Sequence, residues 1–191
     1  MGRKERARAS RSLLIEAARK CFTAHGYEAT TVAEILRRVG MARGALYHYF
    51  PGGKRELFTA VFETINDEFH RRRATISTIE SPVARARAGI RLFLELCTEE
   101  DFARIALTDA PRLVPGQAER GSSYELLRTQ LEEAINAGEV RPFQVDAMAI
   151  ALYGAVRSAG EFVVGASDRA QAADTASRSL DLLLDGLITA D

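Results

Sequence analysis

Thr31-Val-Ala-Glu-Ile-Leu-Arg-Arg-Val-Gly-Met-Ala-Arg-Gly-Ala-Leu-Tyr-His-Tyr-Phe50 is the stretch of this 191-residue chain that decides its fold. Thr31 and Glu34 have the spacing of a capping box, in which two side chains satisfy free amides at the start of a helix. The apolar residues that follow repeat at the spacing of one helix face: Val32, Ile35, Leu36 and Val39. Gly40 then supplies the backbone freedom that a sharp turn needs. The stretch therefore predicts a short helix that ends in a turn.

A second short helix is expected directly after this turn, over residues 42–48. It can bury Leu46 and, just beyond its end, Phe50. Its other side then presents a cation, a small side chain and two rings: Arg43, Ala45, Tyr47 and His48. A short helix that is braced by another and carries such side chains fits the major groove of DNA. We therefore interpret the pair as a helix-turn-helix that reads DNA.

The charge of the chain is distributed unevenly, although its formal net charge is zero. Residues 1–55 hold 12 of the 26 Lys and Arg residues but only 4 of the 26 Asp and Glu residues, an excess of 8 positive charges. A basic head on an acidic body attracts phosphate locally while the body stays off the duplex. A solvated, arginine-rich helix is the alternative explanation of the same composition.

Little in the sequence supports other function classes. Cys21 and Cys97 lie far apart on apolar helix faces, which is typical of buried, reduced thiols in a cytoplasmic protein. We find no apolar run of about 20 residues, no secretory signal and no catalytic motif, so we expect no membrane segment, no enzyme and no cofactor. Asp67 and His70 have i, i+3 spacing, but a metal-binding bundle needs a second such pair, so we expect no metal site.

Helical periodicity runs through almost the whole chain and predicts an all-α fold of about nine helices. After a basic, mobile arm over residues 1–9, helices are expected at about 10–25, 31–39, 42–48, 54–77, 82–97, 102–108, 124–137, 144–164 and 168–188. Residues 110–122, with two prolines and two glycines, are expected to be irregular. The triple Arg71-Arg72-Arg73 is interpreted as the solvated side of the long helix over residues 54–77.

Taken together, these motifs resemble the TetR-type (tetracycline-repressor-like) family of bacterial transcriptional regulators. The resembling residues are Leu13-Leu-Ile-Glu-Ala-Ala, Phe22, Gly26-Tyr27, Thr30-Thr31-Val32, Ile35, Gly40, Gly44-x-Leu46-Tyr47-x-Tyr49-Phe50 and Lys54-x-x-Leu57. The resemblance implies an N-terminal three-helix bundle with the helix-turn-helix over residues 1–53, and a helical ligand-binding and dimerisation domain over residues 54–191. It also implies a homodimer that binds a palindromic operator. Because the dimer has two-fold symmetry, the two half-sites of the operator should lie about 34–36 Å apart, or a multiple of that distance.

The resemblance also assigns candidate contacts to DNA. By analogy, the residues that face base edges are Arg43, Gly44, Ala45 and His48, and those that grip phosphates are Thr31, Tyr47, Tyr49 and Lys54. A guanidinium such as that of Arg43 can bond guanine O6 and N7 together. For His48, packing beside Tyr49 as a surface ring is the alternative.

The chain departs from the family pattern at two places. Ala42 stands where many members have a Ser or Thr at the start of the recognition helix, so the helix cap must come from elsewhere or be missing. The linker Pro51-Gly52-Gly53 is one residue longer than the commonest form, which can change how Lys54 sits against the DNA backbone.

The middle helices carry aromatic and sulfur side chains: Phe62, Phe69, Phe93, Cys97, Phe102 and Tyr124. The resemblance associates them with a cavity for a small hydrophobic effector, in which Tyr124, Arg104, Asp109 or Glu95 could orient the ligand. A packed core without a cavity is the alternative.

The last two helices carry small residues and leucines that suit a four-helix dimer interface: Ala151, Gly154, Ala155, Ser158, Ala159, Leu180, Leu183, Leu184 and Leu187. Alternatively, both helices complete the core of their own subunit. We expect a cytoplasmic, homodimeric repressor that a small molecule releases from double-stranded DNA. A helix-turn-helix protein that binds DNA without a ligand is the alternative function.

Overall fold

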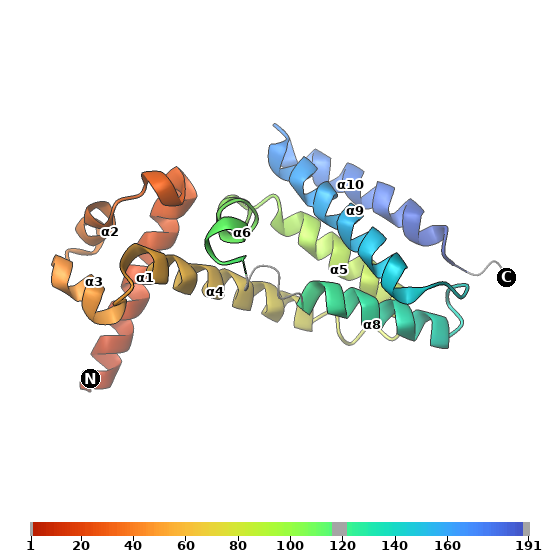
Figure 1. The fold of residues 1–191 in the computed structure, drawn as a ribbon, viewed down its shortest axis with the longest axis horizontal. Coiled ribbons are helices and arrows are strands. Elements are labelled where there is room, and N and C mark those ends of the chain that lie inside the picture. The colour runs from red at the N-terminus through yellow and green to blue at the C-terminus, as the bar shows by residue number, and fades with distance from the viewer. Residues whose placement is uncertain (1, 116–121, 189–191) are drawn as a thin grey trace. The chain divides into compact units, whose positions relative to one another are not determined.

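The computed structural model describes residues 2–115 and 122–188. The chain forms two compact units. The first contains residues 1–68 and 100–118, and the second contains residues 69–99 and 119–191. Figure 1 shows that each unit is built from helices.

The first unit is a helical bundle around a dry core. It contains α1 (Arg3–Ala29), α2 (Val32–Val39), α3 (Arg43–Tyr49), most of α4 (Gly53–Ala74), the π-helix η1 (Phe102–Asp109) and α6 (Ala110–Leu113). Apolar side chains with no exposed surface form the core: Leu14, Ala18, Cys21, Phe22, Ile35, Leu46, Phe50, Leu57, Phe58, Val61 and Ile105. Burying one large side chain of this kind contributes about 1.5–3 kcal/mol. The packing of α1, α2 and α3 confirms the predicted N-terminal three-helix bundle.

The N-terminus corrects one prediction. The expected mobile arm over residues 1–9 is wrong for residues 3–9, because α1 begins at Arg3. The amide of Gly2 donates to Glu5 Oε2 at 2.8 Å, which ties the first turn together. Arg, Lys, Ala and Glu all favour helix, so this basic segment continues α1 outward rather than remaining a coil.

Helix α1 is interrupted at Gly26, one residue after its predicted end. Gly26 has φ +73° and ψ 171°, a backbone conformation that is essentially restricted to glycine. The chain then re-forms one short helical turn up to Ala29 before α2. The glycine therefore sets where the long helix stops and where the helix-turn-helix can begin.

The segment after residue 101 differs from the expected short α-helix and irregular loop. Phe102–Asp109 is a π-helix, a rare form that often marks functional sites. It continues into α6, within the segment expected to be irregular. Pro111 stands in the first turn of α6. Residues 116–121 of the expected loop lie outside the described residues.

The second unit contains the last turns of α4 with α5 (Pro82–Leu96), α8 (Ser122–Asn136), α9 (Val145–Gly165) and α10 (Arg169–Asp185). Gly160 on α9 allows a close approach to α5, because a Cβ there would lie 2.7 Å from Phe93 Cε1. Among the described residues there is no strand, only an isolated antiparallel bridge between Val140 and Ile188. These helices confirm the predicted all-α body.

Several predicted helix starts are confirmed by their caps. Ser81 Oγ accepts from the amide of Ala84 at 3.1 Å, and Pro82 occupies the first turn of α5. Asp168 Oδ1 accepts from the amide of Gln171 at 2.9 Å at the start of α10. Because these caps are local in sequence, the sequence alone indicates them.

The division of the chain differs from the predicted boundary after residue 53. Residues 54–68 of α4, together with η1 and α6, belong to the same compact unit as the helix-turn-helix. The head is therefore braced by residues far along the chain, which periodicity cannot indicate.

Helix α9 is largely apolar, with Asp146, Arg157 and Glu161 as its charged residues. Among the described residues it alone is long and apolar enough, by length and composition, to cross a membrane, and 22% of its most apolar stretch is buried. The helix meets this criterion although Arg157 and Glu161 interrupt its apolar sequence. One such helix is weak evidence for a membrane segment, and the exposed side chains of α9 are described below.

Candidate DNA-binding site

The turn between α2 and α3 forms as the sequence predicts. Thr31 is the N-cap of α2, and its Oγ1 accepts from the amide of Glu34 at 3.2 Å. Gly40 ends the helix in the left-handed conformation, with φ +64°. The amide of Met41 then donates to the carbonyl of Leu36 at 3.1 Å, which closes the turn.

Two buried side chains anchor the inner side of helix α3 in the core. Leu46 and Phe50 have no exposed surface, and the Arg11 guanidinium lies 5.0 Å from the centre of the Phe50 ring. Ala42 gives α3 no side-chain cap, as expected from its side chain, and the first turn is closed by the amide of Ala45 bonding to the Ala42 carbonyl at 2.9 Å. The orientation of α3 therefore depends on packing rather than on capping.

The opposite face of α3 is open to solvent. Arg43, Gly44, Tyr47 and His48 are exposed, and Ala45 and Tyr49 are half-buried. Four residues that the sequence assigned to DNA thus lie on the accessible side of the helix. This face is the candidate DNA-binding surface, defined by these six residues of α3.

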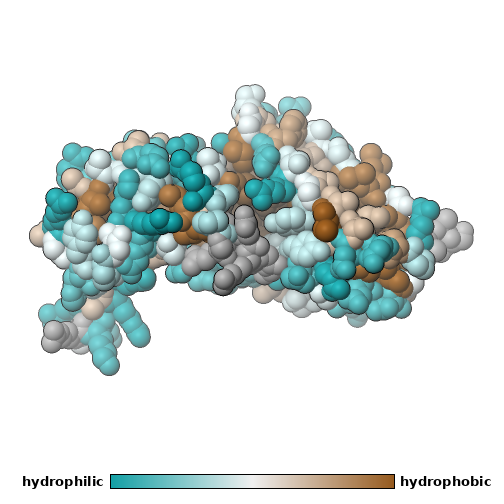
Figure 2. All heavy atoms as spheres, in the orientation of Figure 1, coloured by the Kyte–Doolittle hydropathy of each residue, from teal (hydrophilic) through white to brown (hydrophobic). Residues whose placement is uncertain are grey.

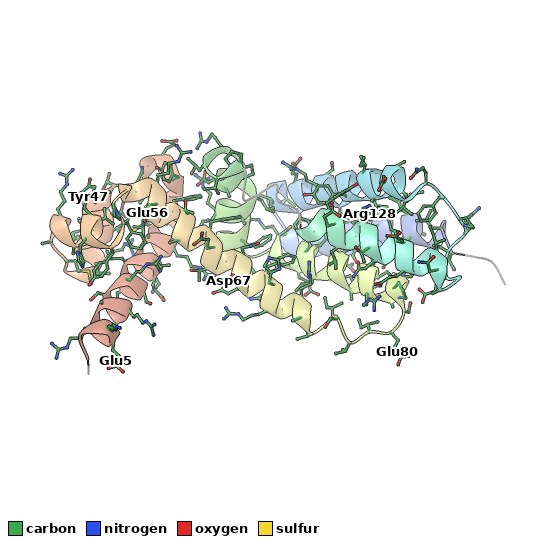
Figure 3. All side chains as sticks on the ribbon, turned by 60° about the horizontal axis from the view of Figure 1, so that its bottom comes forward. Glu5, Tyr47, Glu56, Asp67, Glu80 and Arg128 are labelled. Carbon is green, nitrogen blue, oxygen red and sulfur yellow. The ribbon has the colours of Figure 1, made fainter. Side chains whose placement is uncertain are left out.

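Tyr47 is positioned by the linker that follows α3. Gly53 has φ +66°, and a Cβ built there would lie 3.4 Å from Tyr47 Cε1. The amide of Gly52 donates to Glu56 Oε2 at 2.7 Å, so Glu56 fixes the linker from the first turn of α4. Figure 3 shows Tyr47 on α3 and Glu56 on α4 within the first unit. The tyrosine ring remains 45% exposed.

His48 packs beside Tyr49 as a surface ring, which is the alternative expected from the sequence. Its ring lies edge-on to that of Tyr49, with centroids 4.8 Å apart and an interplanar angle of 73°. The imidazole is nevertheless exposed, so this contact orients the ring on the surface without removing it from solvent.

Lys54 has a role that the sequence did not indicate. Its ammonium donates to the carbonyls of Tyr27 at 2.8 Å and Thr30 at 2.9 Å, and it lies 4.2 Å from the centre of the Tyr27 ring. A contact to the carbonyl of Glu28 measures 3.5 Å. The ammonium therefore caps the end of α1 in this structure, and the expectation of a phosphate grip needs correction because its donors face protein carbonyls.

The same end of α1 is held by residues from η1. Asp109 is buried, and its Oδ2 accepts from the amide of Tyr27 at 2.9 Å. The guanidinium of Arg104 covers Gly26, where an added Cβ would lie 1.9 Å from its Nη2. Arg104 Nε lies 3.8 Å from the Asp109 carboxylate. These two residues were expected as ligand-orienting groups, but they instead brace the segment that leads into α2.

A second brace joins α1 to α4 and to the start of η1. Arg19 donates through both terminal nitrogens to the Glu68 carboxylate at 2.8 Å, and through Nε to Asp101 at 2.7 Å. These hydrogen bonds outweigh partial burial and raise the pKa of Arg19 above its usual value. A bidentate pair of this kind fixes geometry as well as charge. Sequence spacing offers no signal for it, because its members are distant in the chain.

The six residues predicted to line a ligand cavity are divided between the units. Phe62 and Phe102 are buried in the first unit, whereas Phe69, Phe93, Cys97 and Tyr124 belong to the second. The second unit contains a cavity of about 420 Å³, and none of the six lines it. Burial raises the pKa of the Cys97 thiol to about 12.

Within the described ranges, no group of three or more His, Cys, Asp or Glu residues could hold a metal ion.

The predicted interface residues separate into exposed and buried sets. Ala151, Gly154, Ser158 and Leu183 are exposed, and Ala155, Ala159 and Leu187 are half-buried. Leu180 and Leu184 are buried within the subunit itself. For these two leucines, the alternative that the last two helices complete the core of their own subunit therefore holds. The sequence did not single out three other exposed apolar residues of the same helices: Ile150, Phe162 and Leu182.

Comparison with known proteins agrees with this architecture. The family model of the bacterial regulatory proteins of the tetR family matches residues 14–61, and the model of the tetracyclin repressor-like C-terminal domain matches residues 83–187. The crystal structure of a TetR-family transcriptional regulator from Pectobacterium atrosepticum is 30% identical, with a TM-score of 0.80 over 100% of this chain and 99% of that chain.

Curated relatives are similar over shorter stretches. The HTH-type transcriptional repressor Rv1474c of Mycobacterium tuberculosis is 30% identical over 137 residues, 70% of each chain. The HTH-type transcriptional repressor AcnR of Corynebacterium efficiens is 46% identical over 52 residues, so the match spans only 27% of its length. The two matched models and the full-length structural likeness show that this chain belongs to the TetR family of bacterial regulatory proteins, with a helix-turn-helix in its N-terminal unit.

Proposed function

We propose that this protein is a homodimeric transcriptional repressor that binds a palindromic DNA operator and is released from it by a small molecule. The observation that carries the proposal is the exposed face of α3, which shows Arg43, Gly44, Tyr47 and His48 above the buried Leu46 and Phe50. An exposed cation and a helix surface without bulk at Gly44 allow close approach to base edges. The protein acts in the cytoplasm, where the operator is accessible.

The roles of the individual residues follow from their positions on α3. Arg43 begins the helix and reads guanine through two hydrogen bonds, while Gly44 and Ala45 permit contact with a thymine methyl group. The phosphates of the DNA backbone are contacted by Tyr47, Tyr49 and, at the start of α2, Thr31. Lys54 supports this arrangement from within the protein by capping α1 through the carbonyls of Tyr27 and Thr30.

The proposed dimer uses the exposed faces of α9 and α10. On α9, Ile150, Gly154, Ser158 and Phe162 follow one another at intervals of four residues and are all exposed. Ile150 is 64% and Phe162 57% exposed, and on α10 Leu182 is 72% and Leu183 52% exposed. Figure 2 shows apolar colours gathered over these helices. Exposed apolar area on this scale is typical of a protein interface, and a second copy fits a palindromic operator.

Release by a ligand requires that ligand binding in the second unit changes the position of the recognition helix α3 in the first unit. The chain passes between the two units within α4 at residues 68–69 and again at residues 99–100. Just after the second passage, Arg104 and Asp109 of η1 hold the end of α1 at Gly26 and Tyr27. A ligand that prefers one position of this segment changes operator affinity, and a coupling free energy of about 1–3 kcal/mol corresponds to about 5–150-fold.

Selection of bound duplexes from a random-sequence pool tests the proposal. We expect enrichment of a two-fold symmetric sequence whose half-sites are about one helical turn apart. Recovery of unrelated sequences with equal affinity would favour a protein that binds DNA without sequence preference. If a specific complex forms and no small molecule weakens it, the alternative of a ligand-independent helix-turn-helix regulator holds.

A further inference from the structure

The second unit contains a cavity of about 420 Å³, a volume in the range of ligand sites in proteins. It is lined by the end of α4 and the turn after it, by α5, and by α8. We call it the Arg73 cavity, after the residue on α4 that distinguishes it. The interpretation of Arg71-Arg72-Arg73 as a wholly solvated triple is wrong for this third arginine, because Arg73 is half-buried and lines the cavity.

Arg73 brings an unsatisfied donor into this space. Its Nη1 is buried and, within the described part of the chain, makes no hydrogen bond. Burial also lowers the pKa of its guanidinium, which shows that the charged form loses hydration there. A buried N–H of a charged group without an acceptor costs free energy, so the side chain is stabilised by any acceptor that enters the cavity.

The other charged groups of the cavity largely satisfy one another. Arg85 donates to the carboxylate of Glu133 and, at 3.2 Å, to the carbonyl of Ile79. The Glu133 carboxylate is therefore already paired and does not serve Arg73. His70 is the remaining ionisable group among the lining residues. Arg85 and Glu133 cancel each other, so the permanent charge left among these lining residues is the positive charge of Arg73.

The remaining lining residues define what kind of anion fits. Gln130 is buried, and both it and Thr129 on α8 offer neutral polar groups. Leu126 and Ile76 supply apolar wall. One free cation matches a monoanion better than a phosphate dianion, and the apolar wall matches a ligand with a hydrocarbon part.

We propose that the Arg73 cavity binds a small organic carboxylate, whose oxygen accepts the free N–H of Arg73 while its hydrocarbon part lies against Leu126 and Ile76. The proposal specifies the expected small hydrophobic effector as an amphipathic monoanion. Binding itself is independent of DNA. That the carboxylate also releases the operator rests on the proposed function.

Calorimetric titration of the full chain with straight-chain carboxylates from butanoate to dodecanoate, each beside its primary amide, tests the binding step. We expect at least one carboxylate to bind at least tenfold more tightly than its amide. Arg73→Met should abolish that preference, and Arg73→Lys should retain part of it. Arg71→Met is the matched control, because Arg71 is exposed on the same helix and does not line the cavity; it should bind as the parent does.

Alkyl phosphates of the same lengths form the third arm of the titration. Tighter binding of the phosphates, equal binding of acid and amide, or unchanged binding by a folded Arg73→Met protein would each overturn the proposal. The melting temperature of each variant shows whether it is folded. If Arg73→Met does not fold, the reduced preference expected of Arg73→Lys provides the test instead. DNA affinity without ligand is measured separately, so a failure of operator binding is distinguishable from a failure of this cavity.

Discussion

The carboxylate of Asp109 accepts a hydrogen bond from the backbone amide of Tyr27 at 2.9 Å, although 82 residues separate them in the chain. Tyr27 directly follows Gly26, where a non-helical backbone conformation interrupts α1. Asp109 is only 5% exposed and is also close to two cations, Arg104 at 3.8 Å and Arg112 at 3.9 Å. The entry to the helix-turn-helix is thus fixed by the π-helix η1.

Asp109→Ala should destabilise the first unit by about 1–3 kcal/mol, because it leaves the half-buried amide of Tyr27 without this acceptor. Urea unfolding followed by circular dichroism measures this loss. Asp67→Ala, at an exposed carboxylate of α4 labelled in Figure 3, is the control and should change stability by less than about 0.5 kcal/mol. Equal stability of the two variants would show that the Tyr27 contact contributes nothing.

Gly26→Ala and Gly44→Ala should have opposite effects. Gly26 has φ +73° and lies under the guanidinium of Arg104, so alanine should cost about 1–3 kcal/mol of stability there. Around Gly44 nothing lies within 4 Å of an added Cβ, and alanine favours helix by about 1 kcal/mol. Gly44→Ala should therefore keep or raise the melting temperature while it weakens DNA binding. Thermal unfolding and DNA titration of both variants provide the comparison.

Cys97 should make stability fall at high pH. Burial raises the pKa of its thiol from 9.0 to about 12, so the unfolded chain loses this proton between these values while the folded chain keeps it. The free energy of unfolding contributed by the thiol is therefore complete below pH 9 and declines as the pH rises toward 12. Urea titrations across this range should show a weaker decline for Cys97→Ala. A native protein that reacts with iodoacetamide at Cys97 as fast as the unfolded chain would contradict the burial.

The proposed dimer face should be sensitive to charge at its exposed apolar positions. Phe162→Glu places a carboxylate on the α9 face and should convert the dimer to a monomer that remains folded. Sedimentation velocity at micromolar concentration measures the species. Glu161→Gln, at the exposed neighbouring position, is the control and should leave the dimer intact. A parent protein that sediments as a monomer would remove the basis of the proposed dimer.

Much of the helix-turn-helix could be predicted because its signals are local. Thr31 caps α2 through the amide of Glu34, Gly40 forms the turn, and Leu46 and Phe50 are buried, all within twenty residues. The Glu34 carboxylate, the other half of the predicted capping box, lies beside His25 and Arg38 instead. Helix starts at Ser81 and Asp168 were predictable for the same reason.

The misjudged positions depend on partners far away in the chain. Lys54 has a position that suits a phosphate contact, but its partners are the carbonyls of residues 27 and 30, which no spacing rule indicates. Arg73 belongs to a basic triple typical of a solvated face, yet it is half-buried and lines a cavity together with residues of α5 and α8. The exposed apolar face of α9 was predictable only in part, because periodicity shows which residues share a face but not which face remains uncovered.

The central claim, that α3 reads base sequence, is tested most directly by the affinity of Arg43→Ala for operator variants, measured by fluorescence anisotropy at several salt concentrations. The selected duplex and duplexes with single base-pair changes serve as ligands. We predict a loss of about 1–3 kcal/mol on the selected duplex, with discrimination relaxed at one base pair of each half-site. A uniform loss on all duplexes, with a reduced salt slope, would show that Arg43 contacts only phosphate and would contradict the account.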